Sequence, residues 1–338
     1  MKKIFHGLIF SVVALFSFTT SAAESLLING AGATFPYPLY SKWFYEYQKI
    51  NPAVKINYQS IGSGGGIKQV TEKTIDFGAS DAPMSDAELS KLSAPIVHIP
   101  TVLGAVAVAY HLPHVGSGLK LTGPVLASIF LGQITKWNDV NIAKLNPGKT
   151  LPSQDILVAH RTDGSGTTYV FTEYLSKISS PWKTKVGAGK SVQWPAGLGG
   201  KGNEGVTALI KQTPGAIGYI ELGFAMQNQL PVAAIQNKAG NFIAPAIASV
   251  SAAASGVKLS ADYRVSLTDS TGAEAYPISS FTYLLVYKKQ VDPVKGKALV
   301  DFLKWAIHDG QKMAEPLYYA PLPGSVVSKV DQTIGQVQ

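Results

Sequence analysis

Three short segments of the chain combine glycines with hydroxyl side chains, the residue types that bind a small anion. They are residues 30–35 (Gly-Ala-Gly-Ala-Thr-Phe), 62–66 (Gly-Ser-Gly-Gly-Gly) and 163–167 (Asp-Gly-Ser-Gly-Thr). Glycine lets the backbone approach a ligand closely, hydroxyls donate hydrogen bonds, and a helix N-terminus presents free N–H groups with a partial positive charge. Any one segment alone would be an ordinary glycine-rich turn. Three of them on one chain indicate an anion site.

An arginine stands immediately beside the third segment. Arg161 follows a predicted strand over residues 156–159 and precedes Asp163 by two residues. A guanidinium group matches two oxygens of a tetrahedral oxyanion, and a neighbouring carboxylate can hold that group in place. We therefore expect Arg161 to bind the anion. A surface salt bridge between Arg161 and Asp163 is the alternative.

The same residues do not form the patterns of an enzyme or a metal site. Ser63 and Ser165 lie outside a Gly-x-Ser-x-Gly elbow, because Ile61 and Asp163 occupy the positions two residues before them. His111 and His114 are three residues apart, but the proline between them argues against a helical pair of ligands. We expect no catalytic residue and no metal.

A nucleotide cofactor is not expected either. Residues 30–35 begin like a dinucleotide-binding fingerprint but end in Phe35 instead of glycine. No acidic residue closes the next predicted strand, residues 54–59, where such a site would bind the ribose.

The elements that position these segments alternate along the chain. Strands are predicted at residues 26–29 and 54–59, and helices at 38–49 and 66–73. This alternation is typical of a mostly parallel sheet covered by helices. The first helix places Leu39, Trp43 and Tyr47 on one face. Ser85 and Glu88 form a capping box at a further helix start.

Two long apolar runs, residues 99–106 and 276–286, predict strands that cross between two lobes. Lobe I would comprise 24–101 and 280–338, and lobe II 102–279, with the ligand cleft between them. The crossings near 101–104 and 277–280 would act as a hinge. A helix over 295–307 would pack back onto lobe I. Residues 233–258 favour no particular element.

The N-terminus resembles an export signal. Lys2 and Lys3 precede an apolar stretch, residues 4–18, and the small residues Ser21, Ala22 and Ala23 follow. We expect a signal peptide over 1–23, cleaved after Ala22 or Ala23, and a periplasmic protein. An uncleaved anchor is the alternative, but a spanning helix needs roughly 20 apolar residues.

Charge and cysteine content narrow the class of protein further. The formal charge is +8, and loss of two lysines with the signal peptide would leave +6. The chain has no dense run of basic residues, so no nucleic-acid partner is expected. It has no cysteine, so it has neither a disulfide nor a lipid-modified cysteine.

Several longer segments resemble one family. Residues 30–35, 61–66, 76–83, 161–167, 198–203 and 214–219 resemble the periplasmic phosphate-binding protein of the phosphate-specific ABC importer. The resemblance covers essentially the whole chain after residue 23. It implies an α/β, type II periplasmic binding fold, with two lobes that each contain a mixed, mostly parallel sheet flanked by helices and are joined by two hinge strands. It also implies a monomer whose partners are inorganic phosphate and membrane permease subunits.

The resemblance further implies a ligand set. Thr34 and Phe35 would bind phosphate through backbone N–H groups, Thr34 also through its hydroxyl, and Asp163 would orient Arg161. The other implied ligands are Ser63, Asp81, Arg161, Ser165, Gly166 and Thr167. Gly64 stands where some members have a second serine, and Thr162 fills a variable position, so no expected ligand group is lost.

Two other functions stay open on sequence grounds. One is a binding protein for another oxyanion, such as sulfate or molybdate. Sulfate carries no proton at neutral pH and is best held by donors alone, so Asp81 and Asp163 argue against it. The other is a secreted phosphate-sensing or adhesion protein on the same scaffold, because a fold and a site do not dictate their use.

Overall fold

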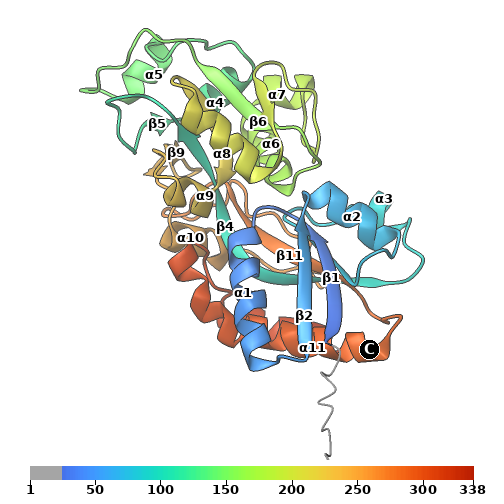
Figure 1. The fold of residues 1–338 in the computed structure, drawn as a ribbon. Coiled ribbons are helices and arrows are strands. Elements are labelled where there is room, and N and C mark those ends of the chain that lie inside the picture. Colours follow the sequence, from blue (N-terminus) through green and yellow to red (C-terminus); the bar gives the residue numbers. More distant parts are fainter. Residues whose placement is uncertain (1–24) are drawn as a thin grey trace, which may run out of the picture.

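The computed structural model describes residues 25–338, which form two lobes; one long strand runs from the first lobe into the second, and the chain returns to the first lobe before β11 (Figure 1). The predicted signal peptide and its cleavage site lie outside the described residues. One lobe contains β1 (Leu26–Gly32), α1 (Tyr37–Ile50), β2 (Val54–Ser60), α2 (Ser63–Thr71), β3 (Phe77–Ser80), α3 (Asp86–Leu89), β11 (Ser279–Tyr287), α11 (Pro293–Ile307), two 3-10 turns (η1, Asp309–Met313; η2, Glu315–Leu317) and α12 (Gly324–Ile334).

The other lobe contains β5 (Lys120–Leu121), α4 (Gly123–Phe130), α5 (Val140–Leu145), β6 (Leu157–Arg161), α6 (Gly166–Ile178), α7 (Ser180–Lys185), β7 (Leu198–Gly200), α8 (Gly202–Gln212), β8 (Ala216–Glu221) and α9 (Leu222–Gln227). The segment 233–258, for which the sequence favours no element, forms β9 (Ala234–Gln236), β10 (Phe242–Ile243) and α10 (Ile247–Ser255). β4 (Ile96–Tyr110) belongs to both lobes.

The main sheet has the strand order β2-β1-β3-β11-β4-β8-β6-β7. β1 pairs in parallel with β2 and β3, and β6 in parallel with β7 and β8. β11 runs antiparallel to β3 and β4, and β4 antiparallel to β8. Residues 96–105 of β4 pair with β11 and residues 106–110 pair with β8, so one buried strand joins the two halves. The lobe boundaries at 101/102 and 279/280 stay a prediction.

The predicted first helix is confirmed as α1. Its apolar face buries Leu39, Trp43 and Tyr47, and Pro36 at the N-cap lacks the N–H that a helix start would leave unpaired. The Trp43 indole also donates a hydrogen bond to the carbonyl of Gly310, at 2.7 Å. The helix predicted at 295–307 is confirmed as α11, whose Phe302 ring packs edge-on against Tyr47.

The capping box predicted at Ser85 is present. The Ser85 hydroxyl accepts a hydrogen bond from the Glu88 N–H, and the Glu88 carboxylate accepts one from the Ser85 N–H at 2.8 Å.

The prediction for α2 placed its start too late. The helix begins at Ser63 and not at Gly66, so three glycines lie in its first turn. Glycine is a poor helix former in isolation. Tertiary contact overrides this preference here. A Cβ on Gly66 would lie 2.6 Å from the Gly32 Cα, and one on Gly64 would lie 3.0 Å from the Gly164 Cα.

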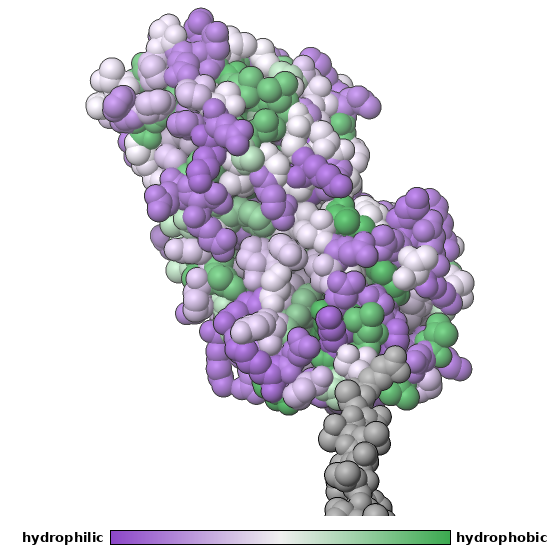
Figure 2. Space-filling model, in the orientation of Figure 1, coloured by the Kyte–Doolittle hydropathy of each residue, from purple (hydrophilic) through white to green (hydrophobic). Residues whose placement is uncertain are grey.

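The visible surface is mainly hydrophilic, with apolar residues in small groups (Figure 2). Among residues 25–338, no helix is both long enough and apolar enough to cross a membrane.

His98 gives a prediction about acid stability. Its Nε2 accepts a hydrogen bond from the Met84 N–H at 3.0 Å, and burial lowers the pKa of His98 to about 4. Because the unfolded chain binds this proton near pH 6.5 and the folded protein does not, the stability is present above that pH and is lost as pH falls to about 4. The loss is about 3 kcal/mol.

We expect His98→Gln, which keeps an acceptor but does not titrate, to flatten the decline in unfolding free energy between pH 6.5 and 4. His308→Gln, at a half-exposed histidine near the end of α11, is the control. The unfolding free energy is measured by urea unfolding at each pH. If it falls with pH in parallel for wild type and His98→Gln, the prediction is contradicted.

Candidate functional site

The N-terminal ends of four helices meet between the lobes. Ser63, the first residue of α2, accepts a hydrogen bond at its Oγ from the N–H of Gly166, the first residue of α6, at 3.0 Å. Thr34, shortly before α1, accepts one from the N–H of Asn203 in α8, at 3.1 Å. Asn203 also donates to Thr167 in α6, at 3.3 Å. The positive ends of four helices therefore lie at one place, which favours an anion there.

The lobes touch closely around this place. The Gly64 N–H donates to the Gly164 carbonyl at 2.8 Å, across the two glycine-rich segments. A Cβ on Gly166 would lie 2.6 Å from both Asp81 Oδ2 and Ser63 Oγ, so glycine is required for this approach. The predicted site residues are all buried except Asp163, which is half-buried: Thr34, Phe35, Ser63, Asp81, Arg161, Ser165, Gly166 and Thr167.

Arg161 lies at the end of β6, fixed by the residues around it. Its Nε donates to Asp163 Oδ1 at 2.8 Å and a terminal nitrogen pairs with Oδ2, so the guanidinium is held at two points. The Arg161 N–H donates to the buried Tyr219 hydroxyl. Burial raises the pKa of the Asp163 carboxyl, but the hydrogen bonds and charge of Arg161 outweigh this and hold it below its usual value. The pair is therefore charged at neutral pH.

Three of the four hydroxyls at the site, those of Thr34, Ser63 and Thr167, have both lone pairs engaged by protein N–H groups. Thr34 Oγ1 accepts two hydrogen bonds from Asn203, at 3.1 and 2.7 Å. Ser63 Oγ accepts from the N–H groups of Gly166 and Asp81. An oxygen with two lone pairs engaged can act further only as a donor.

The two hydroxyls on α6 are arranged in a similar way. Thr167 Oγ1 accepts from Arg161 and from Asn203, both at 3.3 Å. Ser165 Oγ is the N-cap of α6 and accepts from the Thr168 N–H. The Thr167 hydroxyl hydrogen is thus left to bind an acceptor, and the Ser165 hydroxyl can donate as well.

Asp81 is the acceptor of the site. Its Oδ1 accepts a hydrogen bond from the Thr282 hydroxyl at 2.9 Å, and its Oδ2 faces Gly166. Burial raises the pKa of Asp81 to about 7, against the lowering effects of the Thr282 hydrogen bond and the Arg161 charge. A recess of about 190 Å³, lined in part by Pro83, Tyr169 and Arg264, reaches Asp81 from outside.

Sequence reasoning missed two residues that complete the arrangement. Asn203 bridges Thr34 and Thr167, and Thr282 orients Asp81. Asn203 lies within a segment that resembles the family, at the start of a helix after two glycines, which is a usable signal. Thr282 lies in an apolar strand with no such signal.

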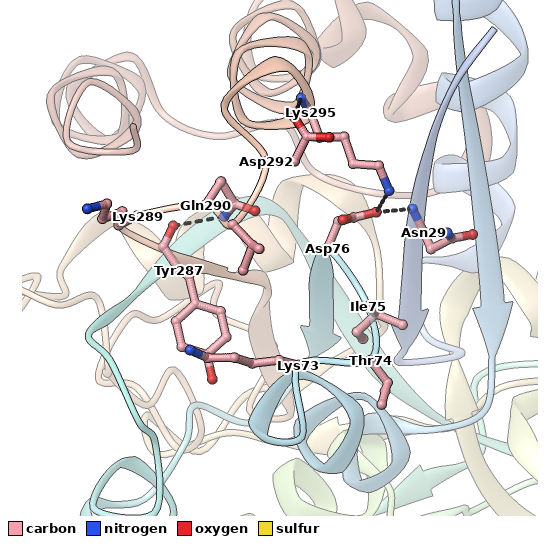
Figure 3. Close-up of a pocket in the computed structure, with 11 residues that line it drawn as sticks. Asn29, Lys73, Thr74, Ile75, Asp76, Tyr287, Lys289, Gln290, Asp292 and Lys295 are labelled. Carbon is pink, nitrogen blue, oxygen red and sulfur yellow. Dashed lines mark hydrogen bonds and ion pairs between the residues drawn. The ribbon is translucent and has the colours of Figure 1, made fainter. Parts of the chain in front are cut away.

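A larger surface pocket, of about 300 Å³, is separate from this site (Figure 3). It lies where β3, β11 and α11 meet, and none of the predicted binding residues lines it. Lysines and carboxylates alternate there: Lys295 pairs with Asp76 at 3.4 Å, and Asp76 accepts from the Asn29 N–H. This mixed charge does not favour a small anion. Among the described residues, no group of three or more His, Cys, Asp or Glu side chains is arranged to hold a metal.

The two lobes, the shared sheet and the buried cleft define a two-lobed solute-binding protein, and residues 19–309 match the model of the PBP superfamily domain. The chain is 48% identical over 311 residues to the phosphate-binding protein PstS of Xylella fastidiosa (strain Temecula1 / ATCC 700964), covering 91% of this chain and 85% of that protein. It is 47% identical over 319 residues to PstS of Pasteurella multocida (strain Pm70), covering 94% and 92%. The chain belongs to the PstS family of phosphate-binding proteins.

A solved structure has the same fold. The high-affinity periplasmic phosphate-binding protein PfluDING, solved with bound phosphate, aligns with a TM-score of 0.74 at 23% identity, covering 91% of this chain and 93% of that one. The predicted family and the predicted two-lobed type II fold are therefore confirmed.

Proposed function

We propose that this protein binds inorganic phosphate in the periplasm and delivers it to the membrane permease subunits of an ABC importer. Its relatives are named phosphate-binding proteins. The observation that carries the proposal is the polarity of the site: three hydroxyls restricted to donation and one arginine surround a single buried carboxylate acceptor. Hydrogen phosphate presents many acceptor oxygens and one O–H, so it matches this set.

The predicted ligand set is adequate in energy without a metal. A hydrogen bond to a charged group contributes roughly 1.5 to 3 kcal/mol, and micromolar affinity needs about 8 kcal/mol net. The proposed ligands are the backbone N–H groups of Thr34 and Phe35 with the groups of Ser63, Asp81, Arg161, Ser165, Gly166 and Thr167. Association and desolvation cost about 4 to 15 kcal/mol, which this number of contacts offsets.

Sulfate, molybdate and a sensing or adhesion role are less favoured. A sulfate ion would set a bare oxygen against the Asp81 carboxylate in a desolvated cleft. A non-catalytic role and a monomeric state belong to the same proposal, since the relatives are named for binding.

Calorimetric titration of the ligand-free protein with phosphate, arsenate, sulfate and molybdate tests this function. We expect phosphate to bind with micromolar or tighter affinity and sulfate to bind far more weakly. Preferential binding of sulfate or molybdate would refute the assignment.

We also propose that the lobes close on phosphate around β4 and the residues before β11. The inter-lobe contacts at the site, such as Gly64 to Gly164 and Lys190 to Glu88 at 2.8 Å, would form on closure. Small-angle scattering should show a smaller radius of gyration with phosphate than without it. An unchanged radius, in a sample shown to start free of ligand, would contradict hinge closure.

A further inference from the structure

A buried glutamate lies behind the site and has no place in the binding set above. Glu221 ends β8 beside α9, and its side chain is inaccessible to solvent. Its Oε2 accepts a hydrogen bond from the Gly223 N–H at 2.8 Å and lies 3.1 Å from the Tyr319 hydroxyl. Its Oε1 has no hydrogen-bond partner among the described residues.

Two chains of contacts lead from Glu221 to the proposed ligand groups. On one side, the Tyr319 hydroxyl donates to the Phe35 carbonyl at 2.7 Å. On the other, the Glu221 N–H donates to Asn203 Oδ1 at 2.9 Å, and the Asn203 amide donates to Thr34. Both chains end at Thr34 and Phe35, whose backbone N–H groups are proposed to bind the anion.

The Tyr319 hydroxyl hydrogen has two acceptors in reach, and the shorter contact, 2.7 Å to the Phe35 carbonyl against 3.1 Å to Glu221 Oε2, favours the Phe35 side. Tyr319 has one hydroxyl hydrogen, and a carbonyl oxygen such as that of Phe35 can only accept. When that hydrogen lies on the Phe35 side, the contact between Tyr319 and Glu221 is attractive only if Glu221 supplies a hydrogen of its own. An ionised carboxylate would instead place lone pairs against lone pairs and would leave a charged Oε1 buried without a partner.

Electrostatics agree with this assignment. Burial raises the pKa of Glu221 well above its usual value, and this outweighs the lowering effect of the hydrogen bond from the Gly223 N–H. The titratable groups that act on it are Tyr319 and Asp81, and the Asp81 charge raises it further. A negative charge here would also repel an anion bound at Thr34 and Phe35.

We propose that Glu221 is a positioning residue that works in its protonated, neutral form: it donates to Tyr319, which fixes the Phe35 carbonyl and so aims the Thr34–Phe35 backbone N–H groups at the bound anion. This role rests on the proposed phosphate-binding function. Glu221 does not touch the anion itself.

Three substitutions separate this role from simple packing. Glu221→Gln keeps the shape and supplies N–H donors, so its phosphate affinity should stay within about threefold of wild type. Glu221→Ala removes the donor to Tyr319, and Tyr319→Phe removes the link to Phe35. We expect each to weaken phosphate binding by about tenfold or more, and the double variant to lose little beyond either single one. Glu46→Gln, on the outer surface of α1, is the matched control and should change nothing.

Infrared spectroscopy tests directly whether the Glu221 carboxyl carries a proton. The infrared difference spectrum between wild type and Glu221→Gln in neutral, phosphate-saturated buffer should contain the carbonyl stretch of a protonated carboxyl group. The same measurement decides the protonation state if Glu221→Ala does not fold.

The outcomes divide cleanly. A Glu221→Gln variant as weak as Glu221→Ala, a Glu221→Ala variant that folds and binds like wild type, or a spectrum without the protonated carboxyl band would each overturn the role of Glu221. Wild type that fails to bind phosphate at all would overturn the proposed function instead, and the infrared band would still report the state of Glu221.

Discussion

Arg161→Ala is expected to weaken phosphate binding a hundredfold or more in calorimetric titration. The substitution removes the buried charge that we propose binds the anion, and it leaves the Asp163 carboxylate without its two-point partner. Truncating one partner of a buried, hydrogen-bonded charge pair between protein and ligand costs about 2 to 5 kcal/mol of binding free energy, and each 1.4 kcal/mol is a factor of about ten in affinity. Arg161→Lys keeps the charge but not the planar fork, so its phosphate affinity should lie between those of wild type and Arg161→Ala.

The chain offers a close control for this experiment. Arg264 is its other arginine; it lines the outer recess that reaches Asp81, but its guanidinium pairs with Asp86 and Asp262 and is not among the predicted ligands. Arg264→Ala should therefore leave phosphate affinity close to that of wild type. Because the unpaired Asp163 could destabilise the fold, the unfolding of each variant is measured beside its affinity. A loss of tenfold or less for a well-folded Arg161→Ala would mean that Arg161 is structural.

Asp81→Asn is expected to remove much of the discrimination between phosphate and sulfate. In the variant, the amide oxygen can keep the hydrogen bond from Thr282, which places the NH₂ group where Oδ2 now faces Gly166. A repelling acceptor thereby becomes a donor. In wild type, bound sulfate would leave a buried acceptor unpaired, which costs a few kcal/mol of binding free energy. The ratio of phosphate to sulfate affinity should therefore fall by about a hundredfold in the variant.

The sign of the pH dependence follows from the same proton. The pKa of Asp81 is raised to about 7, so the carboxyl becomes a donor below that pH and an acceptor above it. Wild-type affinity for sulfate should therefore rise as pH falls through about 7, and the Asp81→Asn variant should lack this rise. Asp76→Asn, in the separate surface pocket of Figure 3, is the matched control. An unchanged ratio of phosphate to sulfate affinity in Asp81→Asn would contradict the role of Asp81 as the group that distinguishes a protonated from an unprotonated ligand oxygen.

Local patterns in the sequence predicted the elements well where one face of a helix is apolar. Leu39, Trp43 and Tyr47 recur every four residues, and α1 buries all three. The predicted start of α2 was wrong because the glycines of its first turn are helical on account of close contacts with Gly32 and Gly164. No local sequence pattern reveals these contacts.

The residues of the site also differ in how far the sequence predicts them. The glycine-rich segments carry hydroxyls and an arginine close together in sequence, so the anion site could be predicted from them. Asn203, Thr282 and Glu221 could not be assigned roles, because each acts through a distant partner. The Asn203 amide meets Thr34 across 169 residues, and the Thr282 hydroxyl meets Asp81 across 201. Only the folded chain brings such pairs together.

The strand order of the sheet also dictates when the protein can fold. β11 lies between β3 and β4, although it follows β4 by more than half the chain. A growing chain therefore leaves the facing edges of β3 and β4 without partners until residues 279–287 have been made. Pairings this distant in sequence are slow to form, because the intervening chain must be closed into a loop first. The first lobe, although it begins the chain, is thus the last to be completed.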